Sequence, residues 1–150
     1  MPTLEESDMK EVYKVTIVGR AGLPESLPWT HRGVRMIYPP GEEISGTAIL
    51  CFRDRDAAVA FLDNNASSGD TWQVWRCEAE GVWIPACILA IYHLTERRAR
   101  EFWADYSSMT FNEFLAKYAD HITRPPCRTR ACSKIVLKEC VSVYPDIING

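Results

Sequence analysis

The feature that most constrains the fold is a strand-like run near the end of the chain. Residues 135–144 read IVLKECVSVY, a stretch rich in β-branched and apolar side chains. This run follows two helical segments, and its apolar face has to be buried against another element. The last strand is therefore expected to return to a sheet built from the earlier part of the chain.

Earlier runs have the character of strands that could form this sheet. They are β-branched, aromatic and partly alternating, and they cover residues 12–18, 34–38, 47–52 and 72–79, with one or two more strands in 82–92, broken near Pro85. In the clearest run, Trp75 and Cys77 share one face. The opposite face turns charged at Arg76 and Glu78, so that end is predicted to meet solvent.

Helical patterns separate these strands. Asp54 or Asp56 is expected to cap a helix over residues 57–62. A second helix is predicted to start at Thr95, and the capping box Thr110-x-x-Glu113 starts a third. The last two helices form a predicted hairpin, and residues 120–133 form a predicted loop.

The order of the elements predicts an α+β fold. Short polar turns favour an antiparallel or mixed sheet, here with one helix between strands and a C-terminal helical hairpin followed by a last strand. A length of 150 residues fits one domain. Residues 1–11 are polar and acidic and are expected to be flexible, which leaves residues 12–150 as the single domain.

Composition points to the cytoplasm. The sequence contains no run of about 18 consecutive apolar residues, so no membrane span is expected. Its acidic N-terminal residues do not resemble a secretory signal. Six cysteines are too few for a disulfide scaffold of this length, and Cys51, Cys77 and Cys87 lie in strand-like runs where free thiols are expected.

The charge is unevenly distributed along the chain. Residues 117–138 hold six basic residues and one acidic residue, a net +5 within a chain of net −3. Arg124, Arg128 and Arg130 in this segment could bind phosphate or an acidic protein surface. Nucleic acid is a weaker candidate, because the loop lacks aromatic residues for base stacking. The alternative is a solvated loop that balances the acidic N-terminal half.

A second candidate site lies in a loop rich in proline and glycine. Trp29, His31 and Arg32 stand close together there, and Tyr38 follows at the end of the next predicted strand. A tryptophan ring together with a histidine and an arginine over a sheet suits stacking with a ligand and contact with an anion. The alternative is that the tryptophan folds back as a cover for the sheet.

Motifs for catalysis or metal binding are weak. His121, Cys127, Cys132 and Cys140 are separated by five, four and seven residues, which does not match paired zinc ligands. The sequence has no nucleophile elbow, phosphate-binding loop or dinucleotide fingerprint. No catalytic residue, metal or cofactor is therefore predicted, and a protein without enzymatic activity is favoured. A Cys127–Cys132 disulfide is the alternative in an oxidising environment.

A family resemblance covers about half of the chain. The residues that carry it are Tyr13-Lys14-Val15, Tyr38-x-x-Gly41, Leu50-Cys51-Phe52, Ala57, Ala58, Phe61 and the run from Val74 to Gly81. On these residues, segment 12–81 resembles a small domain of uncharacterised bacterial and bacteriophage proteins. The resemblance implies a bacterial or phage origin and brings no assigned activity.

The strand-helix-strand order from Leu50 to Ala79 is also similar to the core of ADP-ribosyltransferases. That similarity implies an enzyme that uses NAD, with Tyr38 or Tyr92 as the aromatic residue and Glu139 as the acid. Such enzymes carry Arg or His on their first strand, where this chain has Tyr13 and Lys14.

The leading functional hypothesis is a small cytosolic phage or bacterial accessory protein that acts by binding. Its partner would be a host protein or a nucleotide-like anion, held by the loop at 20–38 and the basic segment at 124–138. The alternatives are an ADP-ribosyltransferase-like enzyme and a structural protein that forms oligomers through its helical hairpin.

Overall fold

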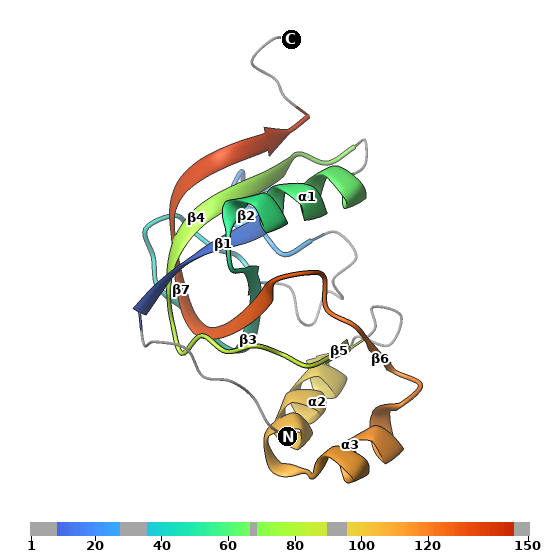
Figure 1. Cartoon of the computed structure of the whole chain (residues 1–150). Coiled ribbons are helices and arrows are strands. Elements are labelled where there is room, and N and C mark those ends of the chain that lie inside the picture. The colour runs from blue at the N-terminus through green and yellow to red at the C-terminus, as the bar shows by residue number, and fades with distance from the viewer. Residues whose placement is uncertain (1–8, 28–35, 67–68, 90–95, 146–150) are drawn as a thin grey trace.

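The computed structural model describes residues 9–27, 36–66, 69–89 and 96–145. These residues form an α+β fold with antiparallel sheets, as the sequence predicts (Figure 1). The elements in chain order are β1 (Met9–Val18), β2 (Pro24–Glu25), β3 (Ile44–Phe52), α1 (Arg55–Asn65), β4 (Trp72–Glu80), β5 (Ile88–Leu89), α2 (Glu96–Ser108), α3 (Phe111–Tyr118), β6 (Ile122–Thr123) and β7 (Thr129–Tyr144).

Four strands close into a ring. β1 pairs with β4 from Met9 to Ile17, β4 pairs with β7, and β7 pairs with β3. β3 then returns to β1 through one residue pair, Tyr13 and Phe52. The sheet therefore encloses its core between its own strands, but its β1–β3 seam is only narrowly closed.

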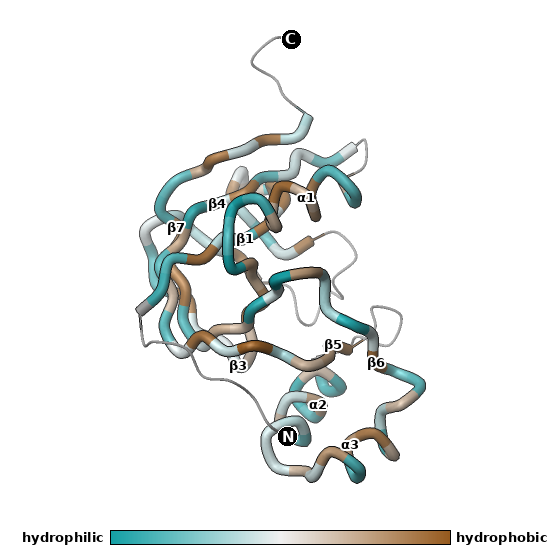
Figure 2. Tube along the Cα trace, in the orientation of Figure 1, coloured by the Kyte–Doolittle hydropathy of each residue, from teal (hydrophilic) through white to brown (hydrophobic). Residues whose placement is uncertain are grey.

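β7 confirms that the last strand returns to the sheet. It is 16 residues long and pairs with β3 through its first half and with β4 through its second half. Hydrophobic and hydrophilic residues alternate along β7 toward its C-terminal end (Figure 2). The strand begins at Thr129, so the predicted loop at 120–133 is wrong over its last residues. Ala131 and Cys132 are buried in the pairing with β3, a tertiary contact that the local sequence does not reveal.

Two other predicted strands differ from the structure. In the described part of 34–38, Ile37 makes one isolated bridge with Glu25 and no strand forms. In 82–92, the described residues form a bridge from Trp83 to Ala131 and the two-residue strand β5. β1 also begins earlier than predicted, at Met9, because its first residues pair with the end of β4.

The two faces of the β1–β4 pair are buried along different parts of these strands. Val12 and Cys77 are paired and face the core inside the ring. Val15 and Val74 are paired on the other face, in the cluster that includes residues of α1. Figure 1 shows α1 lying beside β1 and β4. The charged end of this second face is confirmed at Glu78, which is exposed.

The two C-terminal helices pack around their own aromatic core. Phe102, Tyr106, Phe114 and Tyr118 are buried there and pack edge to face or at a tilt. β5 and β6 join this cluster to the ring, and Figure 1 shows the helices at the opposite end of the molecule from α1. The predicted capping box at Thr110 and Glu113 is present. Among the described residues, none of the helices combines the length and apolarity needed to cross a bilayer.

A buried hydroxyl in β1 tests the packing of the ring. Thr16 is fully buried, and among the described residues its Oγ1 has no hydrogen-bond partner. Replacing Thr16 with valine keeps the shape and removes the unsatisfied group, so the free energy of unfolding should rise by about 1 kcal/mol. Urea unfolding measures this change, and a loss of stability would contradict it.

Thr129 is the matched control for this prediction. It is also buried, but its Oγ1 donates a hydrogen bond to the Pro126 carbonyl at 2.6 Å. The same substitution, Thr129→Val, should lower the free energy of unfolding by about 1 kcal/mol.

Asp54 tests the start of α1. Its carboxylate accepts a hydrogen bond from the Ala57 N–H at 2.9 Å, and this bond, with the charge of Arg128, lowers the pKa of Asp54. Asp54→Ala should cost about 1 kcal/mol at neutral pH, whereas Asp54→Asn should cost less because asparagine also caps helices well.

The lowered pKa of Asp54 sets the direction of a pH effect. Its stabilising contribution is present above the ordinary carboxyl pKa and is lost as pH falls through the lower folded-state value. Both Asp54 variants should therefore lose less stability than the parent chain below about pH 4. Equal acid sensitivity in all three chains, measured by thermal unfolding, would contradict this assignment.

Candidate functional site

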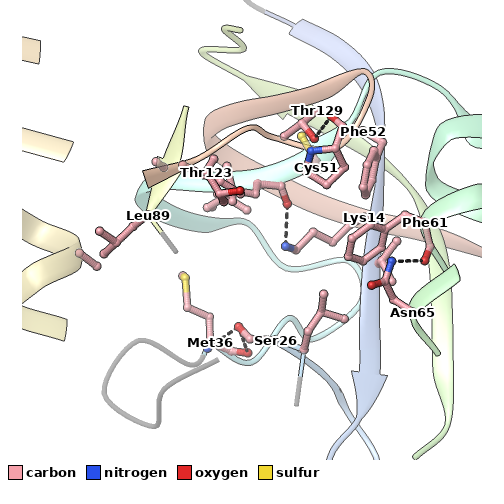
Figure 3. A pocket seen from close by; sticks show the side chains of 18 of the residues that line it. Lys14, Ser26, Met36, Cys51, Phe52, Phe61, Asn65, Leu89, Thr123 and Thr129 are labelled. Atoms are coloured by element: carbon pink, nitrogen blue, oxygen red, sulfur yellow. Dashed lines mark hydrogen bonds between the residues drawn. The ribbon is translucent and has the colours of Figure 1, made fainter. Parts of the chain in front are cut away.

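The seam between β1 and β3 opens next to its single residue pair. One residue beyond Tyr13, Lys14 extends across the opening and its Nζ donates a hydrogen bond to the Leu50 carbonyl at 2.6 Å (Figure 3). The ammonium also lies 5.3 Å from the centre of the Tyr38 ring, within the range of a cation–π interaction. A side chain thus connects two strands where the backbone ladder ends.

A cavity of about 390 Å³ lies at this opening. It is bounded by the ring strands, by the segment after β2, by α1, and by the helical lobe, which is the part formed by α2, α3, β5 and β6. Most of its lining is apolar, and comes from Val15, Leu27, Met36, Ile49, Leu50, Phe52, Phe61, Ile88, Leu89, Trp103 and Pro126. The site is therefore built from segments far apart in the sequence.

Several polar side chains in the lining are engaged within the protein. The Ser26 hydroxyl accepts a hydrogen bond from the Met36 N–H at 2.9 Å. Asn65 donates to the Phe61 carbonyl at 2.8 Å, and Thr129 donates to Pro126 (Figure 3). These bonds shape the wall, which leaves the cationic groups of Lys14 and Arg124 as the polar features suited to a charged ligand.

The basic segment does not form one continuous positive surface. Arg128 pairs with Asp54 at 3.3 Å, Lys134 lies near Glu43 and Glu80, and Lys138 lies 3.7 Å from Glu78. Much of the +5 charge is thus balanced by acidic residues from the rest of the chain. This arrangement matches the alternative reading of a basic segment that neutralises the acidic half.

The predicted binding residues divide into four groups. Tyr38 and Arg124 both line the cavity, so the loop at 20–38 and the basic segment do meet there. Arg128 lines an adjoining hollow beside α1. Arg130 lies outside both linings; its side chain is buried and donates to the Thr129 carbonyl, and burial lowers its pKa. The other predicted residues, Trp29, His31 and Arg32, lie outside the described part of the chain.

Lys14 is the main site residue that the sequence analysis missed. Its signal is a single cation within the strand sequence VYKVTIV. A lysine in a half-buried strand needs an acceptor for its ammonium group, which could have marked the position. The acceptor itself could not be predicted, because Leu50 lies 36 residues away.

The residues considered for catalysis are dispersed. Glu139 lies 3.6 Å from Arg76 in an ion pair and does not line the cavity, whereas Tyr38 does. Tyr92 lies outside the described residues. The two carboxylates of β4, Glu78 and Glu80, face separate lysines.

The potential metal ligands do not converge either. Cys127 is exposed and Cys132 is buried. Within the described ranges, no group of three or more His, Cys, Asp and Glu side chains is arranged to hold a metal ion.

Comparison with protein-family models, with curated proteins and with solved structures finds no match. The resemblance of residues 12–81 to a bacterial and phage domain therefore stays a prediction. The same holds for the similarity to ADP-ribosyltransferases.

Lys14→Met tests the contact across the seam. Methionine keeps much of the apolar stem but leaves the Leu50 carbonyl without its ammonium donor, so the free energy of unfolding should fall by about 1–2 kcal/mol. Lys138→Met is the matched control, since Lys138 forms a surface ion pair with Glu78 and its replacement should change stability by less than about 0.5 kcal/mol. Equal effects of the two substitutions in urea unfolding would contradict a structural role for Lys14.

Proposed function

We propose that this chain is a binding module for a small, mainly apolar molecule that carries one anionic group. The observation that supports this proposal is the apolar cavity at the β1–β3 seam with the Lys14 ammonium in its wall. Ligand sites in proteins are commonly apolar hollows of about 300–1,000 Å³ with a few placed polar groups. At about 390 Å³, this cavity suits a ligand at the small end of that range.

The charge of the ligand follows from the groups available to it. An ammonium group has three N–H donors, and the Leu50 carbonyl takes one of those of Lys14. Arg124 is exposed on the connection between β6 and β7 and adds a second cation to the lining. A carboxylate or phosphate would gain charge-assisted hydrogen bonds from these groups, while its apolar part would occupy the rest of the cavity.

A small ligand is favoured over a protein partner by the surface of the described residues. Their large exposed hydrophobic side chains are Ile37, Phe111 and Tyr144. Phe111 begins α3 and Tyr144 ends β7, at opposite ends of the molecule (Figure 1). A protein interface usually presents a contiguous apolar patch, and these residues do not form one.

Calorimetry with simple probes tests this function. Decanoate should bind, whereas decanol and decyltrimethylammonium should bind at least about tenfold more weakly, since a lost ionic hydrogen bond is worth about 1.4 kcal/mol or more. Adenosine monophosphate tests the same chemistry with a phosphate and a ring in place of the aliphatic chain. Equal affinity for decanoate and decanol would overturn the anionic part of the proposal.

Three variants locate the site. Arg124→Gln and Lys14→Met should each weaken decanoate binding by about tenfold, and Arg124 is exposed, so its replacement leaves the fold intact. Lys134→Gln is the control, because Lys134 is an exposed cation outside the cavity. The proposed function is wrong if decanoate binds both cavity variants with unchanged affinity. It is also wrong if neither decanoate nor adenosine monophosphate binds the parent chain.

A further inference from the structure

Three buried thiols face the interior of the strand ring. Cys51, Cys77 and Cys132 come from β3, β4 and β7, and each is at most 1% exposed. They belong to the same core cluster. The function proposed above uses none of them.

Cys51 and Cys132 lean toward one another across two paired strands. In the β3–β7 register, Cys132 is opposite Ile49 and Cys51 is opposite Arg130, so the two cysteines are diagonal neighbours on one face. The Cys51 thiol donates to the Arg130 carbonyl at 3.7 Å, and the Cys132 thiol donates to the Ile49 carbonyl at 3.6 Å. Each sulfur therefore reaches over the opposite strand, and both lie above the same gap between β3 and β7.

Cys77 is oriented differently. Its thiol donates to the Trp75 carbonyl, on its own strand, at 3.3 Å. Burial raises the pKa of Cys77 to about 12, so it remains a thiol at neutral pH. The ring thus contains one converging pair of cysteines and one cysteine turned back on its own strand.

We propose that Cys51 and Cys132 form a redox-active dithiol, which a small hydroperoxide converts to a disulfide linking β3 to β7. Cys51 lines the cavity at the β1–β3 seam, which provides a route from solvent to the buried pair. At about 390 Å³, the cavity has room for hydrogen peroxide and simple alkyl hydroperoxides.

The electrostatics of the pair support the first step. The neighbouring Cys132 and burial raise the pKa of Cys51, whereas the interaction with Cys51 lowers the pKa of Cys132. The positive charge of Lys14 favours the thiolate of both cysteines. One sulfur of the pair therefore acts as the thiolate nucleophile, and the other completes the disulfide.

The reaction balances with the hydroperoxide as oxidant. The thiolate of one cysteine attacks the terminal peroxide oxygen; an S–O bond forms, the O–O bond breaks, and the departing alkoxide or hydroxide takes a proton to leave as alcohol or water. The sulfur of the other cysteine then attacks the sulfenic acid, an S–S bond forms, and the S–O bond breaks. The hydroxyl leaves as water with the proton of this second thiol. The two sulfurs together lose two electrons and the peroxide gains two.

The disulfide requires a small movement of the strands. Diagonal neighbours in an antiparallel sheet have Cα atoms about 7–8 Å apart, whereas a disulfide needs about 7 Å or less, so β3 and β7 have to approach by about 1 Å. The register of the β3–β7 pair shifts between Ser45 and Ile49, at the end of the regular ladder where Ile49 pairs with Cys132. Such an irregularity breaks the regular ladder and lets the strand adjust locally.

Peptide mapping of the oxidised full chain tests the proposal. Tryptic cleavage at arginine and lysine places Cys51, Cys127 and Cys132 on separate peptides. After treatment of the folded protein with hydrogen peroxide and alkylation of the remaining thiols, mass spectrometry without reduction should show the Cys51 peptide joined to the Cys132 peptide, with the loss of two hydrogens. Reduction should separate them.

Matched variants sharpen the assignment. The linked peptide should persist in Cys77→Ser, which removes the third buried thiol, and in Cys127→Ser, which removes an exposed thiol. It should be absent from Cys51→Ser and Cys132→Ser, whose folding is checked by circular dichroism. The wild-type map decides the question even if these two variants unfold. Oxidation of the exposed Cys127 shows that the peroxide has reacted with the protein. The proposal is overturned if Cys51 and Cys132 are then both still alkylated as free thiols, or if either is found joined to Cys77 or Cys127.

Discussion

The pairing of β7 with both β3 and β4 is the constraint on which the rest of the structure depends. Without it, β3 would be joined to the other strands only through its single residue pair with β1. Because β7 is long enough to serve two partners, the sheet closes on itself and its core is buried between its own strands. The ring then presents its other faces to α1 and to the helical lobe.

The weak point of this ring is also the location of its cavity. A sheet that closes through few backbone bonds leaves space at the seam, and here the Lys14 side chain supplies a contact that the ladder lacks. The same ammonium lies in the wall of an apolar hollow, where a charged group interacts more strongly with an anion than it would in water. Lys14 therefore contributes both to the closure of the seam and to candidate ligand recognition.

The basic residues of the chain are also arranged differently in the sequence and in space. The basic residues that stand together in the sequence are distributed in space among acidic partners from the residue before β3, from β4 and from the cap of α1. Arg124 is the member of that run that lines the cavity. A cluster of like charges in a sequence is thus a poor guide to a charged surface when its members meet acidic partners from other parts of the fold.

Local sequence determined most elements of this protein and tertiary structure determined the site. The strand patterns of β1, β3 and β4, the Asp54 cap and the Thr110 capping box follow from side-chain periodicity and from hydrogen bonds within a few residues. The early start of β7, the loss of the strand at 36–38 and the contact from Lys14 to Leu50 depend on residues distant in the chain. Hydrogen bonds and burial between distant segments exist only once the ring has closed, so no local pattern could have revealed them.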